Sequence, residues 1–167
     1  VRLASVAAPA RVDAATGAVT GERGGGALVS LDRGFRLDVG GDGGGLVRVT
    51  GDDVAMTGGA RISADNDGAG DAPGRGIALD LSGGLRIVGS RIEARRLASG
   101  DGGDVRIDAR TVDLVDNGIV TVESTGGRDA AGMASGRAGS ITVRARDIGL
   151  VNTNENLTAD RATGFVA

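Results

Sequence analysis

The chain has 167 residues, a formal net charge of −3, 32 glycines and no histidine or cysteine. Lysine is also missing, so all 19 basic residues are arginines. These absences exclude imidazole acid–base catalysis, thiol chemistry, lysine Schiff bases and metal sites built from His or Cys. The acidic excess and the lack of aromatic residues other than two phenylalanines argue against a nucleic-acid surface. No apolar run approaches the roughly 18 residues of a membrane span.

The composition changes along the chain in three steps. Residues 1–27 are rich in Ala and Gly and alternate only weakly, so we expect an irregular or imperfect first coil there. Residues 28–160 are expected to form β-helix repeats, beginning with an early coil around Val29 and Leu37. Residues 161–167 are expected to start a further coil or to be a truncated end. Because the chain opens at Val1, without Met or a signal sequence, we expect a segment of a longer protein.

Four copies of one pattern make up most of the repeat region. Each copy has two or three alternating apolar residues, a short turn, a second apolar pair and then a third pair. Alternation is the period of a strand with one buried face, and the Gly-Asp, Gly-Gly and Asn-Gly pairs between the strands favour turns. The copies begin at Val47, Ile77, Val105 and Ile141. Their third pairs are Ile62/Ala64, Ile92/Ala94, Val120/Val122 and Leu157/Ala159.

Three short strands in each copy predict an all-β fold, a right-handed parallel β-helix (β-solenoid) with about 28–36 residues per coil. A propeller blade would need about four strands and usually aromatic signatures. A sandwich would give no reason for equivalent positions to recur, whereas stacked coils require it. The predicted inward columns are Val47–Ile77–Val105–Ile141, Val49–Leu79–Ile107–Val143, Val54–Leu85–Val112–Ile148 and Met56–Ile87–Leu114–Leu150. The predicted outward columns are Thr50–Asp80–Asp108–Arg144 and Ala55–Arg86–Asp113–Gly149.

Two runs carry a family resemblance. Residues 37–49 join a glycine-rich turn to alternating Leu and Val, and residues 99–109 repeat that order with Val and Ile. These runs, and the opening Leu3–Pro9, resemble the filamentous-haemagglutinin-like exoproteins of two-partner secretion systems in Gram-negative bacteria. The resemblance covers residues 28–160 in pattern and implies a β-helical repeat region. The Asn-Pro-Asn motifs of that family's secretion domain are missing, which leaves two alternatives: such a domain lies upstream of this segment, or the secretion route that the resemblance implies does not apply to this chain.

The resemblance also implies a function. It predicts a secreted or cell-surface adhesin that is exported unfolded through an outer-membrane transporter and displays loops from a rigid rod. A glycan or a protein of a host or cell surface is the expected partner, with neither nucleic acid nor a membrane span. Two alternatives are an extracellular fibre built by end-to-end self-association of solenoids, and a polysaccharide-acting β-helix enzyme. The enzyme is the least favoured, so we expect no catalytic residue and no cofactor.

Three acidic stretches have some features of functional sites. Asp65, Asp67 and Gly70 match part of a calcium loop, but Ala69 and Gly76 stand where a carboxylate and a bidentate Glu are needed, which favours a solvated turn. Residues 99–104 resemble one unit of a calcium-binding β-roll without a second copy, so a structural turn and no metal site is expected. A catalytic cluster would combine Asp80, Asp108 and Asp113 with Arg86, Arg106 and Arg110, although charged outward positions are the ordinary expectation.

The remaining features are expected on the surface. The longest loops, residues 65–74 and 126–139, are the best candidates for contacting a partner. Asn156-Leu157-Thr158 is a glycosylation sequon, a pattern frequent by chance. The Arg95-Arg96 pair is interpreted as a solvated corner.

Overall fold

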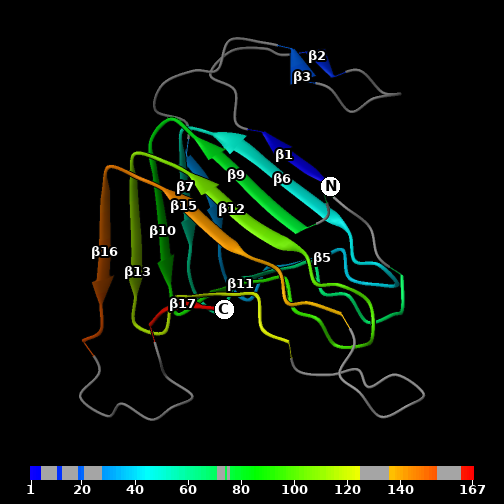
Figure 1. The fold of residues 1–167 in the computed structure, drawn as a ribbon. Helices are drawn as coiled ribbons and strands as arrows, with labels where there is room; N and C mark the ends of the chain where they lie inside the picture. Colours follow the sequence, from blue (N-terminus) through cyan, green and yellow to red (C-terminus); the bar gives the residue numbers. More distant parts are fainter. Residues whose placement is uncertain are drawn as a thin grey trace.

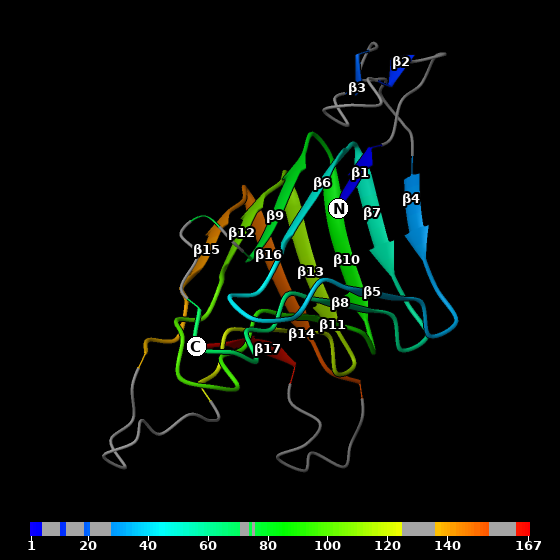
Figure 2. The same ribbon diagram turned by 90° about the vertical axis from the view of Figure 1, so that its right-hand side faces the viewer.

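The computed structural model describes residues 1–4, 11–12, 19–20, 28–70, 74, 76–124, 136–153 and 163–167. Within these residues every regular element is a β-strand, as the glycine content and the alternating pattern predict. Three parallel sheets of five strands each surround a common interior (Figures 1 and 2). None of the described segments is a helix with the length and apolar character needed to cross a membrane.

Each of the three sheets takes its strands from different parts of the chain. In spatial order, the first sheet contains β1 (Arg2–Ala4), β6 (Leu46–Gly51), β9 (Gly76–Leu81), β12 (Asp104–Asp108) and β15 (Ile141–Arg144). The second contains β4 (Leu28–Leu31), β7 (Asp53–Met56), β10 (Gly84–Val88), β13 (Thr111–Val115) and β16 (Asp147–Val151). The third contains β5 (Arg36–Asp38), β8 (Arg61–Ser63), β11 (Arg91–Glu93), β14 (Ile119–Thr121) and β17 (Gly164–Val166). A separate antiparallel pair joins β2 (Arg11–Val12) to β3 (Val19–Thr20).

The order in which the chain visits the sheets explains the sequence repeat. From β4 onward, consecutive strands enter the second, third and first sheets in turn, so each sheet collects every third strand. Neighbours within a sheet are therefore about one sequence repeat apart and run parallel. This stacking of parallel sheets in an all-β chain is the arrangement expected of a parallel β-solenoid.

The strand registers confirm the predicted columns. Val47 lies opposite Ile77, which lies opposite Val105, and Val105 lies opposite Ile141. The other three inward columns and both outward columns follow the same registers, from β6 to β15 in the first sheet and from β7 to β16 in the second. Equivalent apolar residues thus stack directly on one another, and the core is continuous across the sheets.

Inward side chains in the middle of the stack have no exposed surface, whereas those at one end of the stack are exposed to solvent. Val105, Ile107 and Val112 have no exposed surface. In contrast, Ile148 is 52% exposed and Leu150 is 55% exposed, although both occupy predicted inward positions. The reason is that β16 is the edge strand of its sheet and pairs only with β13 among the described residues. No described strand covers these two side chains at this end of the column.

The third column differs from the prediction at its last member. Ile62, Ile92 and Val120 are opposite one another as expected. The sequence pattern predicts Leu157 next, but the residue opposite Val120 is Phe165 of β17. Leu157 and Ala159 lie outside the described residues. A loop of unequal length separates the second and third strands here, and spacing alone cannot show which apolar residue returns to the sheet.

One glycine marks a close approach between strands. Gly76 begins β9 with φ +123°, which favours glycine, and it lies opposite Asp104. A Cβ at Gly76 would overlap the backbone of Asp104. A side chain at this position would therefore force the two strands apart.

Candidate functional site

A column of arginines runs along the outward face of the third sheet. Arg36, Arg61 and Arg91 are register partners on β5, β8 and β11. Their neighbour Ile92 is fully buried in the core, and side chains alternate along a strand, so the arginines leave the opposite face. Glu93 lies on this outward face too, yet it is only 2% exposed. The side chains above it must therefore supply its partners.

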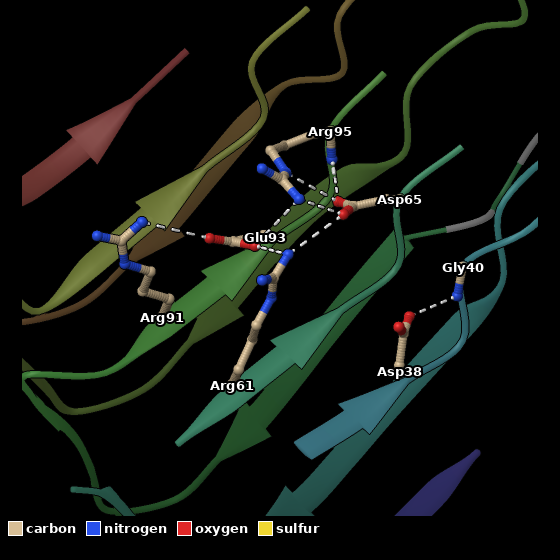
Figure 3. A network of polar contacts seen from close by, with 7 residues as sticks. All are labelled: Asp38, Gly40, Arg61, Asp65, Arg91, Glu93 and Arg95. Carbon is tan, nitrogen blue, oxygen red and sulfur yellow. Dashed lines mark hydrogen bonds and ion pairs between the residues drawn. The ribbon is translucent and has the colours of Figure 1, made fainter. Parts of the chain in front are cut away.

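Three arginines surround the carboxylate of Glu93 (Figure 3). Arg61 Nη2 forms an ion pair with Glu93 Oε2 from the preceding strand of the sheet. Arg95 Nη2 is 3.6 Å from the same oxygen, and Arg91 Nη1 is 3.8 Å from Oε1. A buried carboxylate is stable only when such charges replace its hydration. The network thus explains why an acid can lie under this face.

Asp65 joins the same network from the loop after β8. Its Oδ2 is 2.7 Å from Arg95 Nη2 and 3.5 Å from Arg61 Nη2, while Oδ1 accepts the backbone N–H of Arg95 at 2.8 Å. The hydrogen bond from Arg95 to Asp65, followed by the attraction of Glu93, raises the pKa of the Arg95 guanidinium above its ordinary value. The acids are thus neutralised by arginines of the chain itself, in an arrangement that fixes the register of β8 and β11.

Glu93→Gln is expected to lower the free energy of unfolding by about 2 kcal/mol, because it removes the negative charge that forms ion pairs with Arg61, Arg91 and Arg95. Urea unfolding followed by circular dichroism measures this change. Glu123→Gln is the matched control, since Glu123 lies only partly buried on the next turn and an exposed pair is worth at most about 1 kcal/mol. Equal losses in the two variants would contradict the structural role of Glu93.

A second polar centre lies at the corner after the third sheet, where Asn66 is 1% exposed. Its Oδ1 accepts the N–H groups of Gly43 and Gly68 at 2.8 and 3.0 Å. Its Nδ2 donates to the carbonyls of Gly70 and Asp101 at 2.9 and 2.8 Å. One amide thus connects three successive turns, those near residues 43, 68 and 101.

This centre occupies the stretch that partly matches a calcium loop. Asp65 is bonded to Arg95, and the N–H of Gly70 donates to Asp42 Oδ1 at 2.6 Å. Among the described residues, no group of three or more Asp, Glu, His or Cys side chains is arranged to hold a metal ion. The predicted solvated turn is instead partly buried at its start, because Asp65 is 8% exposed and Asn66 is 1% exposed.

Aspartates connect successive repeats in one direction. In each case a carboxylate accepts a backbone N–H from 28–37 residues further along the chain, about one repeat. Aspartate is suited to this role because its short side chain reaches the neighbouring strand, about 4.8 Å away. This agrees with the composition, which has 18 Asp and 4 Glu. The pairs are Asp42–Gly70, Asp53–Gly84, Asp65–Arg95, Asp101–Arg137, Asp104–Ser140 and Asp116–Thr153.

Two of these pairs involve the stretch that resembles a β-roll unit. Asp101 Oδ1 accepts the N–H of Arg137 at 2.5 Å, and Asp104 Oδ1 accepts that of Ser140 at 2.7 Å. Both acids of residues 99–104 therefore hold the backbone of the next repeat. Their arrangement agrees with the expected structural turn.

The bonds to aspartate predict a loss of stability in acid. The backbone N–H and the hydroxyl of Thr153 lower the pKa of Asp116, and the N–H of Gly40 together with Ser63 lowers that of Asp38. A lowered pKa in the folded state stabilises the protein above the ordinary value of 3.8, and this contribution is lost as the pH falls from there through the folded pKa. We therefore expect the urea midpoint to be flat near neutrality and to fall below about pH 4.

Asp116→Asn tests this pH dependence, because asparagine can still accept from Thr153 and tolerates the positive φ of 44° at this position, but it does not titrate. The variant should show a smaller fall in the urea midpoint between about pH 5 and pH 3 than the wild type. Identical pH profiles for the two proteins would show that Asp116 makes no such contribution.

The predicted solvated corner at Arg95-Arg96 is wrong. Arg96 is 3% exposed; its Nε donates to Ser124 Oγ at 2.8 Å and its Nη1 to the carbonyl of Ala98 at 2.7 Å. Arg95 belongs to the network around Glu93. The physical reason is that Arg96 follows Asn66 in the same column, on the inner side of the corner, where a guanidinium satisfies the carbonyl and the hydroxyl of neighbouring turns.

The six residues considered as a catalytic cluster are not all brought together. Asp80 and Asp108 are opposite each other on the first sheet, where Arg106 Nε pairs with Asp108 Oδ2 at 2.5 Å. Arg86 and Asp113 are opposite each other on the second sheet instead. Arg110 lies at the bend between β12 and β13. The structure therefore divides the set between two faces.

Comparisons of the chain with protein-family models, with curated proteins and with solved structures returned no match.

Two predicted surface features lie largely outside the described residues. Residues 126–135 of the loop 126–139 and the sequon at Asn156 are outside them. The loop at 65–74 is described up to residue 70 and again at 74, and its first part is held by Asn66.

The sequence did not predict the network around Glu93 or the four hydrogen bonds made by the side chain of Asn66. A signal for the first was available, because the third strand of successive repeats reads Arg-Leu-Asp, Arg-Ile-Ser and Arg-Ile-Glu. Aligning these triplets places three arginines in one column beside an acid. For Asn66 there was no comparable signal, because Arg96 and Ser124 replace it in later repeats.

Proposed function

We propose that the chain is a segment of a secreted or cell-surface exoprotein of a Gram-negative bacterium, with an adhesive or structural role. It would wind as a right-handed β-helix of three strands per coil, about 28–36 residues each, and project loops from a stiff rod. Right-handed crossovers are the rule for parallel strands. The return of every third strand to the same sheet supports the three-strand coil.

The observation that carries this proposal is the way in which the repeats are joined. Aliphatic columns without exposed surface, aspartates bonded to the next repeat and the amide of Asn66 all connect neighbouring turns. Such contacts resist bending and make a long, stiff support for surface loops. The absence of cysteine also suits a chain that is exported unfolded, through an outer-membrane transporter as the sequence resemblance implies.

Protease treatment of intact cells of the producing bacterium tests the proposal. Immunoblots with antibodies to this chain should show that the protease removes the protein from intact cells, or that the protein is present in the medium. A cytoplasmic marker protein must survive the same treatment. Protection of the chain until the cells are lysed, with none in the medium, would overturn the proposal.

A further inference from the structure

The corner between β13 and β14 is a tight turn that few residue types can form. In the turn Val115–Gly118, the N–H of Gly118 donates to the carbonyl of Val115 at 2.9 Å (Figure 2). The two central residues, Asp116 and Asn117, have φ values of 44° and 68°. Two successive positive φ values are typical of a type I′ turn, and glycine and asparagine adopt them most readily.

Two earlier corners between the second and third sheets use the same kind of turn, with glycine at the position of Asn117. The turns Asp32–Phe35 and Thr57–Ala60 are closed by equivalent backbone hydrogen bonds of 3.0 and 3.2 Å. Their second central residues, Gly34 and Gly59, have φ values of 72° and 78°. Asn117 therefore meets a backbone requirement that glycine meets in the earlier coils.

The residue after Asn117 is also determined by the fold. A Cβ at Gly118 would overlap the carbonyl oxygen of Ile87, which belongs to the preceding coil. Position 118 therefore has to be glycine. The two requirements together place an Asn-Gly dipeptide in this corner, and Asn117 is the only asparagine of the sequence that glycine follows.

An Asn-Gly dipeptide can lose its side-chain amide without an enzyme, because glycine has no Cβ to shield its backbone nitrogen. Hydroxide takes the proton of the Gly118 N–H, and the nitrogen then bonds to Cγ of Asn117. The bond from Cγ to Nδ2 breaks, and Nδ2 leaves as ammonia with a proton from water, which restores the hydroxide. Water then opens the succinimide ring, either at Cγ to give aspartate or at the main-chain carbonyl to give isoaspartate.

The folded turn holds the attacking nitrogen away from this reaction. The N–H of Gly118 is bonded to Val115, and on either side the N–H groups of Asp116 and Ile119 donate to carbonyls of the next and the preceding coil at 2.9 and 3.0 Å. Because the nitrogen must lose its proton and approach Cγ of Asn117, the turn has to open first. Reaction in the folded protein is thus limited to the molecules in which this corner is open.

We propose that Asn117 is a site of spontaneous deamidation that is reactive in the unfolded chain and protected by folding. Isoaspartate carries the main chain through Cγ and so adds one backbone atom to a turn whose neighbours on both sides are bonded. The modified corner cannot keep these hydrogen bonds, and β14 then loses its place beside β11. Time spent unfolded therefore lowers the fraction of chains that can still fold.

Mass spectrometry of the purified chain tests the site. The chain is kept in mildly alkaline buffer with and without guanidinium chloride and is then digested with trypsin, which yields residues 111–128 with Asn117 as their only amide. In the denaturant this peptide should convert to aspartate and isoaspartate forms. In the folded chain the rate should be at least about tenfold lower, which corresponds to an opening free energy of about 1.4 kcal/mol.

Three controls separate the chemistry from the fold. Asn66, which is followed by Asp67, is an internal reference and should react more slowly than Asn117 in the denaturant. Gly118→Ala should slow the reaction of Asn117 severalfold in the denaturant, where packing plays no part. Asn117→Gly keeps the preferred φ without an amide, so this variant should refold fully after the same time in denaturant.

Refolding tests the consequence. After a long time in denaturant, the folded fraction of the wild type, isolated by size-exclusion chromatography, should contain less isoaspartate at position 117 than the chains that fail to fold. Equal reaction rates with and without denaturant would overturn the protection by the turn. A rate at Asn117 no higher than that at Asn66 in the denaturant would overturn the site, and equal refolding of isoaspartate-containing and unmodified chains would overturn its effect. These measurements use the purified chain, so their outcome is independent of where the bacterium places the protein.

Discussion

Ile107→Asp is expected to prevent folding of the chain. Ile107 has no exposed surface and lies between Leu79 and Val143 in its column. An unpaired carboxylate there meets only hydrocarbon, and a buried unpaired charge costs more than about 4 kcal/mol, a large share of the stability of a domain. Circular dichroism should lose the sheet signal, and size-exclusion chromatography should show an expanded or aggregated chain.

Arg106→Asp is the control for this substitution, because it adds the same carboxylate one residue earlier on the same strand. Arg106 points outward and pairs with Asp108 at the surface. Losing an exposed pair should move the thermal midpoint only slightly. If Arg106→Asp unfolded the chain while Ile107→Asp did not, the assignment of the two faces of β12 would be reversed.

Asn66→Ala is expected to give the second-largest loss. The amide of Asn66 is buried and makes four hydrogen bonds to backbone groups of three turns. Alanine would leave two donors and two acceptors without their partner, and a buried polar group left unpaired costs about 1–3 kcal/mol. Since water can reach part of these turns, we expect a total of about 3–5 kcal/mol. Urea unfolding followed by circular dichroism measures it.

Asn117→Gly is the matched control, since it also removes an asparagine side chain from a turn. Within the part of the chain that the structure describes, the buried Oδ1 of Asn117 has no hydrogen-bond partner, and its φ of 68° favours glycine. Stability should therefore be unchanged or slightly increased. A loss from Asn117→Gly as large as that from Asn66→Ala would mean that the backbone, rather than the four hydrogen bonds, is responsible.

The columns could be predicted because stacking makes each residue meet its own equivalent. Alternation identified Val47 and Val49 as inward, and the spacing of repeats identified Ile77 and Leu79 as their neighbours, both confirmed by the registers. The same reasoning failed at Phe165, because the chain between β16 and β17 follows no repeat. Spacing predicts contacts only where the repeat length is kept.

The repeat pattern did not predict the two polar centres, the network around Glu93 and the hydrogen bonds of Asn66. Arg61 comes from the turn before that of Glu93 and Arg95, and each by itself has the appearance of an ordinary surface charge. Asn66 stands among several acidic residues, a pattern typical of carboxylate sites, and nothing local indicates that its amide makes the bonds. Burial of a charged or polar group depends on the side chains that cover it, and these are contributed by distant parts of the chain.

The sequence by itself determined that the chain is all-β, that its strands stack in parallel columns and which side chains face the interior. These properties follow from the two-residue period of a strand and from a repeat close to thirty residues, both of which are local. Only the tertiary structure decided that Glu93 is buried among arginines, that Arg96 is hidden, and that Ile148 and Leu150 remain exposed. Each of these depends on whether another strand or turn lies next to the residue, and no single segment of sequence contains that information.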